Sequence, residues 1–160
     1  MKKQDIIAWT LVALNTSALF YASSQSVEKS RQSSDKVTQL IVRTVEEVYP
    51  EIREEINYRD LHRNVRKSSH YVLYMMLGYL MANAFRKRGE EKLAYSLLIC
   101  MLISIIDETY QLQIVGRGGE LNDVVIDTIG SATGIGLNKV VCNVKQKLPN
   151  NQLTIKQKML

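Results

Sequence analysis

Four carboxylates lie inside or against apolar stretches of this 160-residue chain, where ionisable side chains are rare. Asp107 and Glu108 close one apolar run, and Asp123 and Asp127 open the next. Arg117 lies in the short glycine-rich link between the two runs. A charged side chain at mid-bilayer costs about 2.5–3.5 kcal/mol on insertion scales. Ionisable residues in such a place therefore predict a functional site.

An imidazole and a second arginine are available to these acids. Arg66, His70 and Tyr74 are spaced four residues apart, so they share one face of a helix. Paired acids near hydrocarbon can acquire the shifted pKa that acid/base catalysis needs, and arginine can hold a phosphate. The candidate catalytic residues are Asp107, Glu108, His70 and Asp127. The candidate ligand-binding residues are Arg66, His70, Tyr74, Gln111, Arg117, Asp123 and Asp127.

A purely structural interpretation stays open, because buried acids paired with arginine can simply fix the register of packed helices. No HExxH motif is present, and we expect neither a metal nor another cofactor. Cys100 and Cys142 have no CxxC partner and are expected to pack as small hydrophobic residues.

Four apolar segments must position these residues, and each approaches the roughly 20 residues that cross a bilayer. The third has no charge from Leu93 to Ile106 and is apolar on all faces over 97–106, unlike an amphipathic helix of a soluble bundle. We therefore predict an all-α fold, a polytopic membrane bundle of four transmembrane helices forming a single domain. The spans are expected at about 6–22, 69–85, 93–112 and 123–144, with an outer loop at 23–67 and a cytoplasmic tail at 145–160. The first segment could alternatively be a signal peptide.

Lysine and arginine in the short loops predict the orientation of this bundle. Lys2 and Lys3 precede the first segment, four basic residues occupy 86–92, and several lysines follow the fourth segment. Arg117 is the only basic residue between the third and fourth segments. We therefore expect a multi-pass cell-membrane protein with both termini in the cytoplasm and the carboxylates at the outer end.

The long outer loop contains a further helix pattern. Its apolar residues fall at helical spacing after Ser34 and Asp35, a pair that could cap a helix, and Pro50 ends the pattern. These apolar residues are Val37, Leu40, Ile41, Val45 and Val48. We expect an amphipathic helix lying on the outer membrane surface. A second helical stretch is expected from Glu51 to about Lys67.

Two of the spans show one face of small and polar residues, because positions on a helix advance about 100° per residue. On the third span this face contains Ser96, Cys100, Ser104, Asp107, Glu108 and Gln111. On the fourth it contains Asp123, Asp127, Gly130, Ser131, Gly134 and Asn138. Gly130 and Gly134 have the GxxxG spacing and are predicted to pack helices closely. Facing these stripes inward would pair the charges, with Arg117 within reach of at least one acid.

Three motifs resemble the VanZ-like family, from the first segment to about Leu137. "SSQS" at 23–26 is similar to the family's polar motif after its first helix. "RKSSHYVLYMMLGYL", which begins at Arg66, resembles a second motif, and "DETYQLQIVGRGGELNDVVIDTIGSATG", which begins at Asp107, resembles a third. Tyr110 stands where the family pattern often has histidine, and the loop 27–65 is longer than the common form.

The resemblance implies an integral membrane protein of the Gram-positive cell envelope. The family's namesake is associated with low-level resistance to the glycopeptide teicoplanin, so antibiotic resistance or the handling of envelope lipid or polysaccharide is expected. The alternatives are an intramembrane enzyme acting on a lipid-linked substrate, with Ser131 or Tyr74 as nucleophile, a structural scaffold, or a small transporter. The expected partners are the lipid bilayer and an envelope lipid, polysaccharide or glycopeptide, and a homo-oligomer stays open. The net charge of +5 and the lack of a basic patch interleaved with aromatic residues argue against nucleic acid.

Overall fold

The structure, a computed structural model, describes residues 3–25, 27–48, 57–85, 91–114 and 120–158, with the backbone alone at 27, 31, 33, 91–92 and 146–158. Its elements are all helices, which confirms the all-α prediction. They are α1 (Lys3–Ser24), α2 (Val27–Val48), α3 (Tyr58–Phe85), α4 (Glu91–Gln111) and α5 (Leu121–Lys158).

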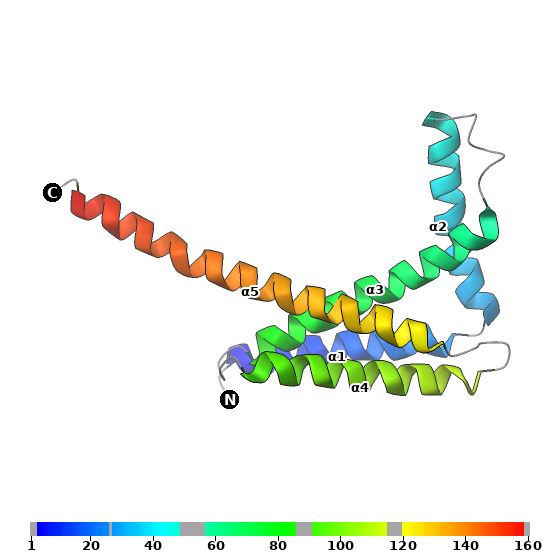
Figure 1. Cartoon of the computed structure of the whole chain (residues 1–160), viewed down its shortest axis with the longest axis horizontal. Helices are drawn as coiled ribbons and strands as arrows, with labels where there is room; N and C mark the ends of the chain where they lie inside the picture. The colour runs from blue at the N-terminus through cyan, green and yellow to red at the C-terminus, as the bar shows by residue number, and fades with distance from the viewer. Residues whose placement is uncertain (1–2, 26, 49–56, 86–90, 115–119, 159–160) are drawn as a thin grey trace.

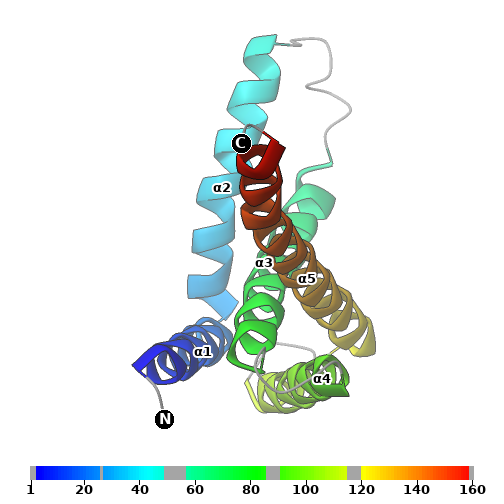
Figure 2. The same cartoon turned by 90° about the vertical axis from the view of Figure 1, so that its left-hand side faces the viewer.

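Four of the helices form an elongated bundle. α1 and α4 run in one direction, and α3 and α5 run back in the other (Figure 1). Viewed along the bundle, α3 lies among the other three helices, and it packs most extensively against α5 (Figure 2). The ends of α1 and α4 and the beginnings of α3 and α5 therefore meet at one end of the molecule.

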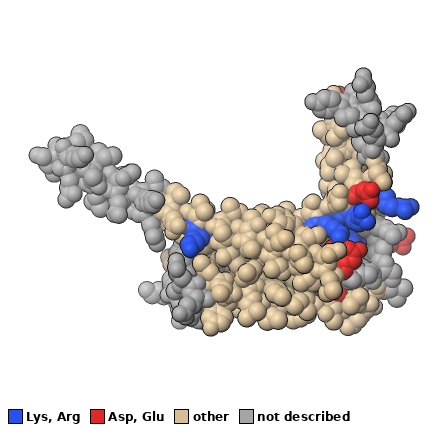
Figure 3. All heavy atoms as spheres, viewed as in Figure 1, with Lys and Arg blue, Asp and Glu red and all other residues tan. Residues whose placement is uncertain are grey.

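The outer surface of the bundle is apolar, as expected of a membrane protein. Large apolar side chains such as Ile7, Leu98 and Ile129 are more than half exposed, and most described charges lie towards the ends of the bundle (Figure 3). Among the described residues, three helical segments are long and apolar enough to cross a membrane, namely Lys3–Ser24, Leu93–Gln111 and Leu121–Lys145.

Three of the four predicted spans therefore coincide with candidate membrane spans. α3, which contains the predicted span 69–85, is not among the three candidates. Its first half, before Ser69, is rich in charged residues, although the half that follows packs alongside the other spans. A membrane crossing at 69–85 stays a prediction.

The core lies between α1, α3 and α4. Its buried residues are Val12, Leu19, Tyr74, Leu77, Met81 and Cys100. Trp9 and Phe85 extend this core with an edge-to-face ring contact at 5.1 Å between centroids. Both cysteines are free thiols, and Cys100 packs within the core as a small hydrophobic residue.

Glycines allow α3 and α5 to approach until their backbones touch. A Cβ atom on Gly130 would lie 2.6 Å from the backbone oxygen of Tyr71. A Cβ atom on Gly134 would collide with the backbone of Met75, and one on Gly78 with the backbone of Ser131. This contact fixes the position of α5 along α3.

The loop that was predicted to lie outside the membrane contains the expected helix, α2, but this helix begins earlier than its expected cap. It starts at Val27, so Ser34 and Asp35 lie within it, and the Ser34 carbonyl accepts a hydrogen bond from the Thr38 hydroxyl at 2.8 Å. α2 stands across the direction of α1 and α4 (Figure 1).

The helix expected from Glu51 begins later in the described part of the chain. α3 starts at Tyr58, and residues 51–56 lie outside the described residues. Asn57 caps α3, because its Oδ1 accepts hydrogen bonds from the backbone N–H groups of Arg59 and Asp60 at 3.2 and 3.4 Å.

Candidate functional site

A cluster of polar side chains forms where α1 and α4 end and α3 and α5 begin. We call it the carboxylate cluster. Its members are Ser23, His70, Tyr74, Ser104, Asp107, Glu108, Gln111 and Asp127. Asp107 and Asp127 are both 0% exposed, so neither faces the surrounding lipid. The cluster residues come from four helices, α1, α3, α4 and α5, and they lie towards the end of the bundle where these helices meet.

Asp107 ties α4 to α1. Its Oδ2 accepts hydrogen bonds from the Ser23 hydroxyl at 2.8 Å and from Gln111 Nε2 at 3.0 Å. Gln111 also lies 3.3 Å from Ser23 Oγ. Gln111 follows Asp107 by one helical turn, so both side chains point to the same face of α4. The small Ser23 side chain allows α1 to come close enough to complete the network.

Asp127 joins α5 to α4 and lies near α3. Its Oδ2 accepts a hydrogen bond from the Ser104 hydroxyl at 2.8 Å. Its Oδ1 is buried, has no hydrogen-bond partner among the described residues, and lies 4.0 Å from His70 Nδ1. That separation exceeds hydrogen-bond length. Asp127 therefore offers one acceptor oxygen that the described side chains do not use.

Tyr74 and Glu108 line the same space. The Tyr74 side chain is fully buried, and its backbone carbonyl accepts a hydrogen bond from Ser131 Oγ at 3.3 Å. Glu108 is almost fully buried, and its Oε2 accepts the backbone N–H of Glu120 at 3.1 Å. Glu108 thus fixes the chain just before α5 to the end of α4.

Lys67 and Arg66 lie at the partly exposed rim of the cluster. Lys67 Nζ lies 2.9 Å from both Asp123 Oδ1 and Glu120 Oε2, and Arg66 approaches Asp123 Oδ2 only to 4.0 Å. Hydrogen bonds to Asp123 and then to Glu120 raise the pKa of Lys67 above its ordinary value. The hydrogen bond from Lys67 lowers the pKa of Glu120. The rim therefore holds a charged lysine with two acids, and an arginine that is less closely engaged.

The candidates predicted from the sequence are largely brought together. The described ones at this end of the bundle are Arg66, His70, Tyr74, Asp107, Glu108, Gln111, Asp123 and Asp127. Arg117 lies outside the described residues, so its predicted ion pair with an acid stays a prediction. Sequence reasoning named no site role for Ser23, Lys67 or Glu120. For all three residues the only signal was their place within the stretches that resemble family motifs.

The cluster combines buried acceptors with cationic donors at its rim. Among the described residues, no group of three His, Cys, Asp or Glu side chains could hold a metal ion. Carboxylate oxygens can accept hydrogen bonds from hydroxyl or amide groups of a ligand, and guanidinium can bind a phosphate or carboxylate. These groups can together form hydrogen bonds and ion pairs with a polar molecule.

Comparison with known proteins assigns the family. The family model described as VanZ/LLP1 matches residues 8–142, which include the whole carboxylate cluster and its rim. No curated protein and no solved structure matches the chain. The bundle contains a buried polar cluster and three candidate membrane spans among its described residues. The family model matches most of the chain, and these findings lead to one assignment. This chain belongs to the VanZ/LLP1 family of membrane proteins.

Proposed function

We propose that this protein acts in the cell envelope by binding the polar headgroup of a lipid-linked envelope molecule or of a glycopeptide at the carboxylate cluster. The proposal places the cluster at the outer end of four membrane spans, with both termini in the cytoplasm. Reduced antibiotic access to its envelope target, and hence glycopeptide resistance, would be the cellular consequence.

The buried oxygen of Asp127 supports this proposal most directly. A carboxylate oxygen buried without a hydrogen-bond partner costs about 1–3 kcal/mol, and more if it is charged. A cluster that only held helices together would be expected to pair both oxygens, as buried polar groups usually are. Asp127 Oδ1 instead has no hydrogen-bond partner among the described residues. A donor group on a ligand would satisfy it.

The rim supports an anionic or sugar-bearing headgroup. Arg66 is about one third exposed, and its guanidinium lies 4.0 Å from Asp123, too far for a strong hydrogen bond. It can therefore turn towards a phosphate without breaking a close pair. Lys67 holds Asp123 and Glu120 in place beside it.

Separating function from folding tests the proposal. Asp127→Asn keeps the shape of the side chain, so a binding role predicts a folded protein that loses its envelope phenotype. We would measure teicoplanin susceptibility in cells and thermal unfolding of the same variant in detergent. Glu108→Gln serves as a second cluster variant, and Glu47→Gln, exposed on α2, is the matched control.

A direct binding measurement completes the test. A polyprenyl phosphate added at a hundredfold excess over its Kd should stabilise the wild-type protein by about 2.7 kcal/mol, seen as a rise in its unfolding temperature. Asp127→Asn and Arg66→Gln should reduce that rise, and Glu47→Gln should retain it. If every loss of phenotype follows a loss of folded protein, the acids are architecture and the binding role is wrong.

The His70–Asp127 pair also favours a second candidate, an intramembrane enzyme acting on a lipid-linked substrate. A histidine and a carboxylate 4.0 Å apart could exchange a proton with a substrate bound between them. The nucleophile candidates are weaker, because the Ser131 hydroxyl donates to the Tyr74 backbone carbonyl rather than to a base. Release of phosphate from a polyprenyl diphosphate by the purified protein, abolished in His70→Gln, would establish this activity.

A further inference from the structure

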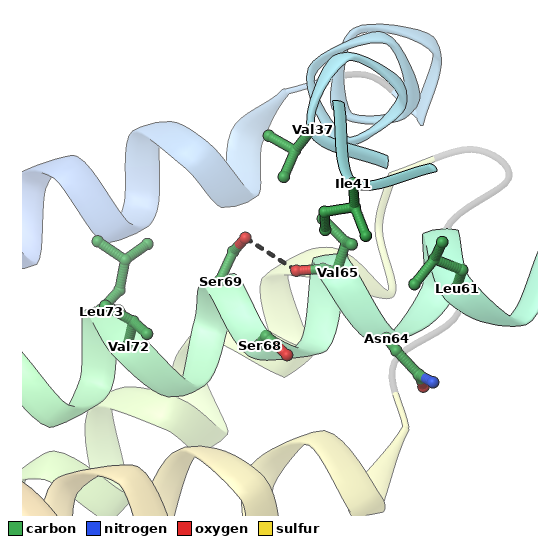
Figure 4. A pocket seen from close by; sticks show the side chains of 9 residues that line it. All are labelled: Val37, Ile41, Leu61, Asn64, Val65, Ser68, Ser69, Val72 and Leu73. Atoms are coloured by element: carbon green, nitrogen blue, oxygen red, sulfur yellow. Dashed lines mark hydrogen bonds between the residues drawn. The ribbon is translucent and has the colours of Figure 1, made fainter. Parts of the chain in front are cut away.

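An apolar groove lies in the angle between α2 and α3. Its volume is about 650 Å³, within the range of about 300–1,000 Å³ that is typical of small-molecule sites. Its apolar lining comes from Val37 and Ile41 of α2 and from Leu61, Val65, Val72 and Leu73 of α3 (Figure 4). Val65, which lines the groove, and Lys67 are two residues apart, so they lie about 200° apart around the axis of α3. The groove is therefore on the face of α3 away from Lys67.

The polar residues of the groove do not make it a polar site. The Ser69 hydroxyl donates to the Val65 carbonyl at 2.9 Å, within its own helix. Asn64 and Ser68 point away from α2, whereas Val37 and Ile41 point towards α3 (Figure 4). The space between the two helices therefore presents mainly apolar surface.

The groove is continuous with the apolar outer surface of the bundle. Val72, at one end of the groove, is 45% exposed, and Met76 one turn further along α3 is 48% exposed. From Leu61 to Leu73 the groove follows α3 for about 18 Å. A hydrocarbon chain beside α3 can thus pass beneath α2 without crossing water.

We propose that the groove binds one acyl chain of a bilayer glycerolipid, drawn from the outer leaflet to lie beneath α2. In this arrangement Val37 and Ile41 cover the acyl chain. Their side chains thereby extend the apolar surface of the bundle to the space beneath α2. The inference does not depend on the ligand of the carboxylate cluster, because the two sites occupy different faces of α3. It assigns α2 a binding role that the family match alone does not provide.

Size and hydrogen bonding favour an acyl chain over a peptide. A helix about 10 Å wide and 18 Å long occupies on the order of 1,400 Å³, more than twice the groove. An extended peptide would bring backbone N–H and C=O groups that need partners, and the groove offers few. An acyl chain brings none of these groups and buries apolar area along its whole length.

Photolabelling of the full-length protein tests this proposal. The protein would be placed in nanodiscs that contain a phosphatidylcholine with a diazirine in its acyl chain, and labelled residues would be mapped by mass spectrometry. Labelling at Ile41 and Val65 should exceed labelling at Leu40 several-fold. Leu40 lies on the same apolar face of α2 and is 66% exposed, but it does not line the groove.

Variants that fill the groove supply the control. Ile41→Trp should reduce labelling of the remaining groove residues by more than half, whereas Leu40→Trp should leave it unchanged. Val65→Trp fills the groove from α3, so a folding defect in one variant leaves the other informative. Equal labelling at Ile41 and Leu40 would mean ordinary bilayer contact and would overturn the proposal. Crosslinks between two copies of the chain through Ile41 would assign the groove to a dimer and overturn it as well.

Discussion

Asp107 and Asp127 each accept hydrogen bonds through Oδ2, but from different numbers of donors. Asp107 accepts hydrogen bonds from Ser23 and Gln111 on one oxygen, which ties two helices together. Asp127 uses one oxygen for Ser104 and leaves the other without a hydrogen-bond partner among the described residues. Because Asp107 accepts from two donors on two helices and Asp127 from one, we propose that Asp107 is mainly architectural and that Asp127 is the ligand-binding residue.

These roles predict different outcomes for two substitutions, one of a donor to Asp107 and one of Asp127 itself. Ser23→Ala should destabilise the protein by about 1–3 kcal/mol, because it removes a hydrogen bond to a buried carboxylate. Asp127→Asn should cost less stability and more function. Thermal unfolding and teicoplanin susceptibility of the two variants, measured side by side, check the prediction. The reverse ranking of the two stabilities would contradict the assignment.

The ion pairs at the rim predict a dependence of stability on pH. The pKa of Lys67 is raised above 10.5, so its contribution is complete below that pH and is lost as pH rises through the folded-state value. The pKa of Glu120 is lowered below 4.5, so its contribution is present above that pH and is lost as pH falls through the folded-state value. The pairs therefore stabilise the fold between these limits.

Lys67→Met should lower the unfolding temperature within this window and have little effect outside it. Partly exposed pairs of this kind contribute about 0.2–1 kcal/mol each. Thermal unfolding of the wild type and the variant across the acid-to-alkaline range gives the comparison. An equal loss at every pH would instead point to the packing of the lysine stem.

The close contact between α3 and α5 depends on glycine. Gly134→Ala should destabilise the protein by about 1–3 kcal/mol, because its methyl group would overlap the backbone of Met75. A methyl group on Gly136, half a turn further along α5, would meet nothing within 4 Å, so Gly136→Ala is the matched control and should be neutral or stabilising. Unfolding midpoints of the two variants decide between close packing and general helix propensity.

α2 is predicted to lie in the membrane surface. Its apolar residues Leu40 and Val48 are at least 60% exposed, which is costly in water and favourable in an interface. A spin label at Leu40 should be accessible to oxygen from the lipid phase, and one at Arg43 should be accessible to a water-soluble relaxation agent. Equal accessibility to the aqueous agent at both positions would place α2 in solvent.

The sequence predicted the helices better than their ends. The uncharged run from Leu93 to Ile106 predicted α4, because a segment that is apolar on all faces has few alternatives to a buried or membrane helix. The start of α2 was missed, since Ser34 resembles a cap, whereas Ser34 is buried in the structure within a longer helix. Tertiary packing, which a local pattern does not contain, decides such boundaries.

The sequence also predicted which acidic residues would be buried in the site. Charge is costly in hydrocarbon, so Asp107 and Asp127 were expected to face inward, and both are fully buried. The roles of Lys67 and Glu120 depend on how α3 meets the beginning of α5, across 53 residues of sequence. No spacing rule links residues so far apart, so this pair could not be derived from helical periodicity.

For the whole molecule, the direction of the helices predicts the topology. Reporters fused at Val45, Gly89, Gly118 and Asn150 should read outside, inside, outside and inside if 69–85 crosses the membrane. If only the three more apolar segments cross, an inside N-terminus would give outside, outside, inside and outside instead. The reporter at Gly89 therefore decides whether α3 is a fourth span.

The claim that the carboxylate cluster binds a ligand can be tested with one experimental structure. The protein would be extracted from its native membrane with its lipids and determined experimentally at a resolution that shows bound headgroups. We expect density for a polar headgroup within hydrogen-bond distance of Asp127 Oδ1, with Arg66 turned towards it. A dry cluster in which both Asp127 oxygens are paired with protein side chains would contradict the claim.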